Sequence, residues 1–99
     1  MFVGTITFDL LLGDVRSLKQ KRAYVRPIVA ELRRRFEVAV AEVNHQDLHR
    51  RAEIGVAVVS AEERRCAEVL DAVEQHVARR PEIELLSTGR RIHNDEDDR

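Results

Sequence analysis

The stretch NHQDLHRR holds the side chains whose types and spacing could do chemistry. His45, Asp47 and His49 stand at alternate positions, and with Asn44 they supply three or four donors from one segment. Such donors can bind a metal ion or transfer protons. The spacing matches no established ligand motif, however, and loops between strands are often made of these residue types. We therefore expect a solvated loop without metal, in which Asp47 caps a turn and Leu48 closes the end of the core.

Two other residues are candidate nucleophiles. Ser17 precedes an apolar periodic segment, where a serine hydroxyl commonly accepts a hydrogen bond at the start of a helix. Cys66, the single cysteine, falls on the apolar stripe of a second such segment and should be an inert core residue. One cysteine can neither close a disulfide within the chain nor form a zinc ribbon. We therefore expect a protein that is not an enzyme and that has no catalytic residue, no cofactor and no small-molecule substrate.

Composition and charge set broad limits on the function. The 99 residues fit one domain, and 43% apolar with 35% charged residues is normal for a folded chain. No apolar run is long enough for a membrane span, so a cytoplasmic protein is expected. Without residues 94–99 the charges are 17 − 1 = 16 basic and 18 − 4 = 14 acidic, a net +2. That excess is too mild to indicate nucleic-acid binding, so the placement of the charges must decide.

The order of elements predicts the fold. Alternating apolar residues favour strands over residues 2–12, 36–43, 52–60 and 82–92. Helical periodicity follows Ser17 and again follows the sequence SAEE, where Ser60 and Glu63 could form a capping box. Pro27 should kink or restart the first helix, and Pro81 should end the second. The order β-α-β-β-α-β predicts an α+β, ferredoxin-like sandwich, with two helices on one face of a four-stranded antiparallel sheet.

This fold divides the chain into one domain and a tail. The domain is expected over residues 1–93, followed by an acidic, disordered tail at 94–99. Its predicted core contains Phe8, Leu10, Leu32, Val40, Val56, Leu70 and Val73.

The same topology predicts which charged segments meet. The sequences SLKQKR, NHQDLHRR and ARRPE should gather at one end, where six cations converge: Lys19, Arg22, Arg26, Arg50, Arg79 and Arg80. Lys19, Arg22, Arg26 and Arg33 fall within about 60° of one another around the first helix. Lys21 instead points toward the core, as Glu42 does from the second strand, so the two are expected to form a structural ion pair.

The segments SLKQKR and RRRFEVAVAEVNHQDLHRRAEIGVAVVS together resemble the YlxP-like family, small bacterial proteins classed as a domain of unknown function. The resemblance covers nearly the whole chain and implies the same ferredoxin-like fold. The genes of this family commonly lie among those for translation initiation and ribosome maturation, and members have been labelled as ribosome-binding factors. The positions that match are Ser17, Leu18, Lys19, Lys21, Arg22, Glu42, Gln46, Asp47, Leu48, Arg51 and Ala52. The family pattern usually has Trp where His49 stands and does not require His45.

Three function classes remain open from the sequence. The first is a non-enzymatic accessory factor that binds ribosomal RNA or a ribosomal particle through the cations at the basic end, since Lys and Arg contact phosphates. The second is a module for protein interaction or self-association, including a homodimer, through the open sheet face or the edge strand after Phe36. The third is an enzyme that uses the histidine loop. The predicted open face lacks aromatic residues, which argues against base stacking there.

Overall fold

The computed structural model describes residues 1–95. The strands are β1 (Phe2–Leu12), β2 (Ala39–Asn44), β3 (Arg51–Ser60) and β4 (Ile83–Asn94), and the helices are α1 (Leu18–Phe36) and α2 (Glu63–Ala78). Their order along the chain is the predicted β-α-β-β-α-β. The four strands form one antiparallel sheet in the order β2-β3-β1-β4.

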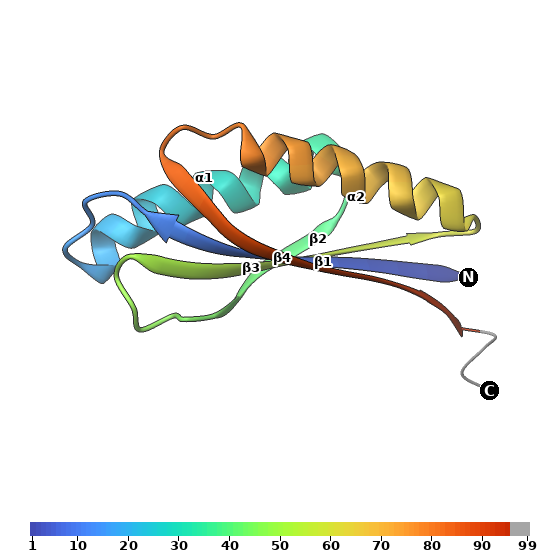
Figure 1. Ribbon diagram of the computed structural model, residues 1–99, viewed down its shortest axis with the longest axis horizontal. Coiled ribbons are helices and arrows are strands. Elements are labelled where there is room, and N and C mark those ends of the chain that lie inside the picture. Colours follow the sequence, from blue (N-terminus) through green and yellow to red (C-terminus); the bar gives the residue numbers. More distant parts are fainter. Residues whose placement is uncertain (96–99) are drawn as a thin grey trace.

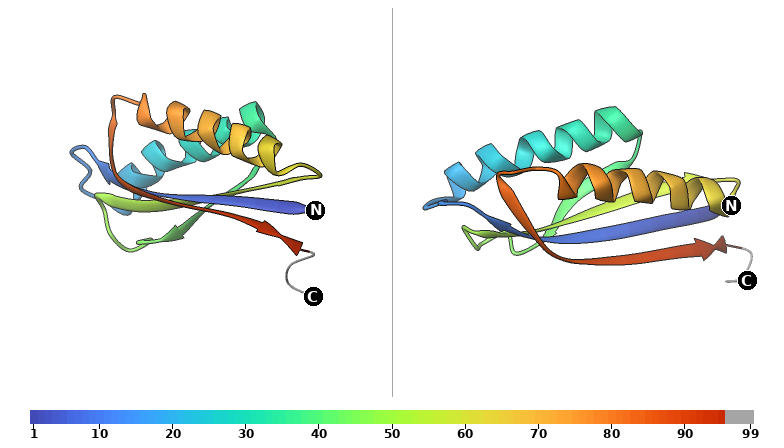
Figure 2. Two further views of the ribbon diagram at one scale, coloured as in Figure 1. Left: turned by 45° about the vertical axis from the view of Figure 1, so that its right-hand side comes forward. Right: turned by 45° about the horizontal axis from the view of Figure 1, so that its top comes forward.

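Both helices cover the same face of the sheet, and the other face is bare of helices (Figures 1 and 2). Even-numbered side chains of β1 and β3 point toward the helices, because strand side chains alternate and these are the apolar ones. All seven predicted core residues are buried in the single apolar cluster between the sheet and the helices. The ferredoxin-like sandwich is therefore confirmed.

Helix α1 begins where the sequence indicates. The Ser17 hydroxyl accepts a hydrogen bond from the Gln20 amide at 3.1 Å, and the helix ends at Phe36 with Glu37 in the left-handed region, φ 52°. The sequence suggested that Pro27 would kink or restart this helix. Helix α1 does not restart there, because it is continuous through Pro27. Pro27 and Ala23 are both exposed, so water can solvate the Ala23 carbonyl that the proline cannot bond.

The ends of three other elements differ from the sequence prediction. The Ser60 hydroxyl accepts from the Glu62 amide, and Glu62 itself takes the N-cap position, so the expected capping box does not form. Strand β2 starts at Ala39 rather than residue 36, because α1 continues to Phe36. Asn94 belongs to β4 and pairs with Phe2, so the domain extends past residue 93. The rest of the predicted disordered tail, residues 96–99, lies outside the described residues.

Candidate nucleic-acid interface

The loop that joins β2 to β3 is held by a buried lysine. Lys21 is only 2% exposed, and its Nζ lies 2.8 Å from Oε2 of Glu42. The same ammonium donates a hydrogen bond to the carbonyl of His45 at 2.6 Å. The predicted ion pair is therefore confirmed, and the second bond adds a function for Lys21. It fixes the start of the loop, where His45 has a φ of 63°.

His45 faces the open side of the sheet. Its Nε2 lies 3.9 Å from Oδ1 of Asp9, and the Arg51 guanidinium donates a hydrogen bond to Oδ2 of Asp9 at 2.5 Å. That hydrogen bond from Arg51 holds the pKa of the Asp9 carboxyl below its ordinary value of 3.8. His45 is partly buried, so the expectation that it is solvated was wrong. Arg51, a loop position of the family, acts as a structural partner of Asp9.

The rest of the loop is a solvent-exposed turn. The turn is closed by the Leu48 amide, which donates to the carbonyl of His45 at 3.0 Å, and Gln46 donates weakly to the carbonyl of Glu42. Leu48 is 48% exposed and does not close the core, contrary to the sequence prediction. Asp47 and His49 are exposed. Within residues 1–95, no group of three or more His, Cys, Asp or Glu side chains could hold a metal ion.

The basic face of α1, which we define as Lys19, Arg22, Arg26 and Arg33, is exposed along one side of the helix. Lys19, Arg22 and Arg26 border a hollow of about 400 Å³ beside Pro27. Arg22, Arg26 and Arg33 border a second hollow of about 470 Å³ that reaches Glu42 on β2. Among residues 1–95, Lys19, Arg22 and Arg26 form no ion pair. Their charges are therefore free to meet an anionic partner.

Arg33 differs from the other members of this face. Its Nη2 donates to the carbonyl of Val40 at 2.5 Å, so the side chain crosses from α1 to the edge of β2. This contact covers part of the edge strand that the sequence offered for pairing with another chain.

Two of the six cations predicted at the basic end, Arg50 and Arg80, make contacts within the molecule. Figure 1 places the start of α1 and the β2–β3 loop at one end of the molecule, and Arg50 borders a hollow there with residues 81–84. However, the Arg50 guanidinium donates to the carbonyls of Leu12 and Gly13. Arg80 is half-buried and forms ion pairs with Glu31 and Glu82. Arg80 is therefore a structural residue, and Arg79 is exposed.

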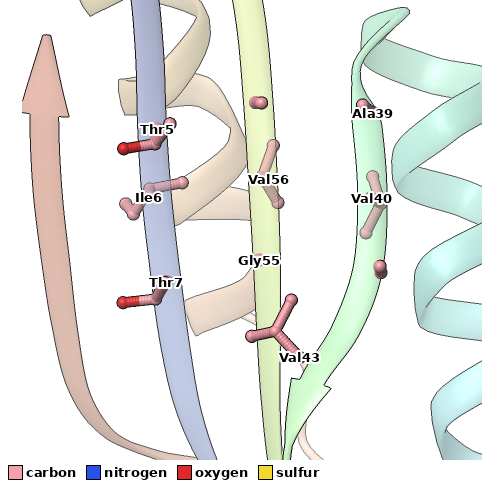
Figure 3. A pocket seen from close by; sticks show the side chains of 10 residues that line it. Thr5, Ile6, Thr7, Ala39, Val40, Val43, Gly55 and Val56 are labelled. Atoms are coloured by element: carbon pink, nitrogen blue, oxygen red, sulfur yellow. The ribbon is translucent and has the colours of Figure 1, made fainter.

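The open face of the sheet carries a shallow hollow of about 370 Å³ (Figure 3). Thr5 and Thr7 of β1 line one side, and Val43 lies against Gly55 on the other. A Cβ on Gly55 would come within 3.0 Å of a Val43 methyl group, so glycine allows the valine to cover this strand. The remaining lining is apolar and contains no aromatic residue, in agreement with the sequence prediction; it consists of Ile6, Ala39, Val40, Ala41, Val56 and Ala57.

None of the helices in the described part of the chain has the length and apolar character needed to cross a membrane.

Comparison with known proteins places the chain in a class and then in a family. The structure is similar to the solution NMR structure of a de novo designed protein with a ferredoxin fold. The match covers 95% of this chain and 87% of the designed chain, with a TM-score of 0.58 and 11% sequence identity. Residues 3–90 match the family described as a protein of unknown function, DUF503, and the chain belongs to that family. It is 30% identical over 86 residues to the uncharacterized protein YlxP of Bacillus subtilis (strain 168), covering 87% of this chain and 94% of that protein.

Proposed function

We propose that this chain is a non-enzymatic accessory factor that associates with ribosomal RNA or a ribosomal particle in the bacterial cytoplasm, through the basic face of α1. The observation that carries the proposal is the set of three exposed cations, Lys19, Arg22 and Arg26, without an ion pair among residues 1–95. The resemblance to the YlxP-like family supports ribosomal RNA as the partner.

The spacing of these cations suits a phosphate backbone. At 1.5 Å of rise per residue, Lys19 and Arg22 are separated by about 4.5 Å along the helix axis, and Arg22 and Arg26 by about 6 Å. Three charges in a row can each neutralise a phosphate, and binding of this kind is strongly dependent on salt. Tyr24 is half-buried and is the sole aromatic residue between Lys19 and Arg33, so stacking on bases is not a plausible main source of affinity. The expected contact is with the backbone and not with base edges.

The test is co-sedimentation of tagged protein with ribosomal fractions at two salt concentrations. Association of the wild-type protein should fall steeply from low to moderate ionic strength. The double variant Lys19→Gln with Arg22→Gln should bind less, and the slope of log affinity against log salt should decrease by about one for each lost phosphate contact.

A matched control removes two charges elsewhere. Arg64 and Arg65 on α2 are 83% and 65% exposed, so Arg64→Gln with Arg65→Gln changes the net charge equally without touching α1. This control should retain wild-type association. If the Lys19 and Arg22 double variant binds as well as wild type at both salt concentrations, the proposal is wrong. A control that loses as much binding as the test variant would also refute it, because total charge would then explain the effect.

A further inference from the structure

Helix α1 has a proline in its interior, one turn after an exposed alanine. Pro27 has no N–H, so the Ala23 carbonyl lacks the donor that any other residue at position 27 would provide. Both residues are exposed, and the Ala23 side chain is only a methyl group, so a ligand has room to reach this carbonyl. A proline inside a helix is strongly destabilising, and a residue that breaks a local rule in this way marks a candidate functional site.

The Ala23 carbonyl lies among the free cations of α1. Lys19, Arg22, Ala23, Arg26 and Pro27 line the same hollow of about 400 Å³. Around the helix axis, Arg22 and Arg26 lie within about 60° of Lys19 on one side, and Ala23 and Pro27 lie about 40° and 80° from it on the other. The three cations form no ion pair among residues 1–95. The hollow therefore combines three cationic donors with a carbonyl acceptor that has no donor from the helix.

This combination matches the sugar–phosphate backbone of RNA. Phosphates accept hydrogen bonds from Lys and Arg, and they donate none. In RNA the 2′-hydroxyl supplies a donor on the sugar between two phosphates, and DNA lacks that group. We propose that the Ala23 carbonyl accepts a hydrogen bond from a ribose 2′-hydroxyl while Lys19, Arg22 and Arg26 hold the flanking phosphates, so that α1 selects RNA over DNA. The contact rests on the proposed function, because it uses the same cations.

The size of the preference follows from the kind of bond. The hydroxyl replaces a water molecule on the carbonyl, and a neutral hydrogen bond of this kind should favour RNA by about two- to tenfold. The phosphate contacts are the same in the two nucleic acids, and they carry the dependence on salt. The ratio of RNA to DNA affinity should therefore stay constant between two salt concentrations, although both affinities fall.

The first experiment measures the binding of single-stranded oligouridine and oligodeoxyuridine of equal length by fluorescence anisotropy at low salt. Pro27→Ala supplies an N–H to the Ala23 carbonyl, so its affinity for oligouridine should fall to that for oligodeoxyuridine, while the latter stays unchanged. A mere shift of the cations along α1 would instead change both affinities together. The control is Pro81→Ala, at an exposed proline beyond the end of α2, which should keep the wild-type preference.

The outcomes separate this contact from the proposed function. Equal affinity of the wild-type protein for the two strands, or a Pro27→Ala variant that keeps the full preference, refutes the ribose contact and leaves the proposed function in place. Absence of binding to both strands refutes the ribose contact as well. Co-sedimentation with ribosomal fractions then decides independently on the proposed function.

The second experiment locates the hydrogen bond by NMR spectroscopy. The ¹³C resonance of the Ala23 carbonyl should shift when oligouridine is added and should move little with oligodeoxyuridine. The carbonyl of Ala72, an exposed alanine on α2, is the control and should not respond to either strand. An equal shift of the Ala23 carbonyl with both strands would show that it does not bind the 2′-hydroxyl.

Discussion

Lys19 and Lys21 lie two positions apart on α1, yet the fold uses them in opposite ways. Lys21 is 2% exposed and bonds both Glu42 and the carbonyl of His45, so its charge is fully used within the molecule. Lys19 is exposed and forms no ion pair within residues 1–95. At 100° per residue the two side chains point in directions about 160° apart. The comparison teaches that cations close together in the sequence form a surface patch only if their side chains point to the same side of the helix.

The largest expected effect is that of removing the buried lysine. Lys21→Ala should lower the free energy of unfolding by about 1 to 3 kcal/mol, because Glu42 and the His45 carbonyl lose a donor in a partly buried place. Urea unfolding measures the loss. The double variant Lys21→Met with Glu42→Leu should recover much of it, because no carboxylate is then left without a partner. An unchanged midpoint in Lys21→Ala would mean that the pair does not hold the loop.

The next effect concerns the ion pairs that join α1 to the end of α2. Arg80 bonds Glu31 and Glu82 from a half-buried position, whereas its neighbour Arg79 is exposed. Arg80→Gln should therefore cost about 1 kcal/mol of stability, and Arg79→Gln close to nothing. Thermal unfolding of the two variants makes the comparison. Equal melting temperatures of the two variants would mean that the ion pairs of Arg80 do not stabilise the fold.

A smaller effect should appear at acid pH. The Arg51 hydrogen bond lowers the pKa of Asp9 from 3.8, and the Arg80 hydrogen bond lowers the pKa of Glu82 from 4.5. A lowered folded-state pKa means that the stabilisation is present above the unfolded value and is lost as pH falls through the folded value. Stability should thus decline below about pH 4.

The variant Asp9→Asn tests the contribution of this carboxylate to the acid transition. The stability gap between it and wild type should narrow on acidification, since the wild-type carboxylate becomes neutral too. Asp14→Asn, at an exposed carboxylate paired with the exposed Arg16, provides the control and should show a smaller gap at neutral pH. A gap for Asp9→Asn that stays constant from pH 7 to about pH 2 would contradict the assignment.

The smallest expected effect on stability is that of the outward cations. Lys19→Gln with Arg22→Gln should change the free energy of unfolding by less than about 0.5 kcal/mol, because neither exposed side chain loses a charged partner. Circular dichroism during urea unfolding checks this on the same protein that is used for ribosome co-sedimentation. A large destabilisation would show that these residues support the fold, and it would remove the contrast with Lys21.

Much of the fold follows from periodicity alone. The buried side of α2, with Cys66, Val69, Leu70, Val73 and Val77, repeats at helical spacing, and Cys66, Leu70 and Val73 were predicted to lie in the core. The Lys21–Glu42 pair could also be predicted, because helical direction and strand alternation independently turn both residues inward. Each of these depends on a repeating geometry that extends over many residues.

Local side-chain bonds were harder to predict. The Ser60 hydroxyl could either cap a helix or close a turn. In the structure it accepts a hydrogen bond from the Glu62 amide in the turn after β3. Leu48 was expected to close the end of the core because it is apolar, but its side chain is 48% exposed in the loop. His45 was expected in solvent, but Lys21 binds its carbonyl and its ring nitrogen Nε2 lies 3.9 Å from Oδ1 of Asp9.

The sequence by itself determined the two layers, the core and the direction of each helical side chain, because apolar burial repeats with the period of each element. Only the tertiary structure decided which cations remain available. Arg80 meets Glu31 across 49 residues of chain, and Arg50 reaches the carbonyl of Leu12 across 38. Such partners depend on how separate elements pack. Neither the spacing of the residues nor the composition shows which residues so far apart in the sequence will meet. The basic face of α1 and the apolar hollow on the open face of the sheet are therefore defined by packing, while the residues that form them are defined by sequence.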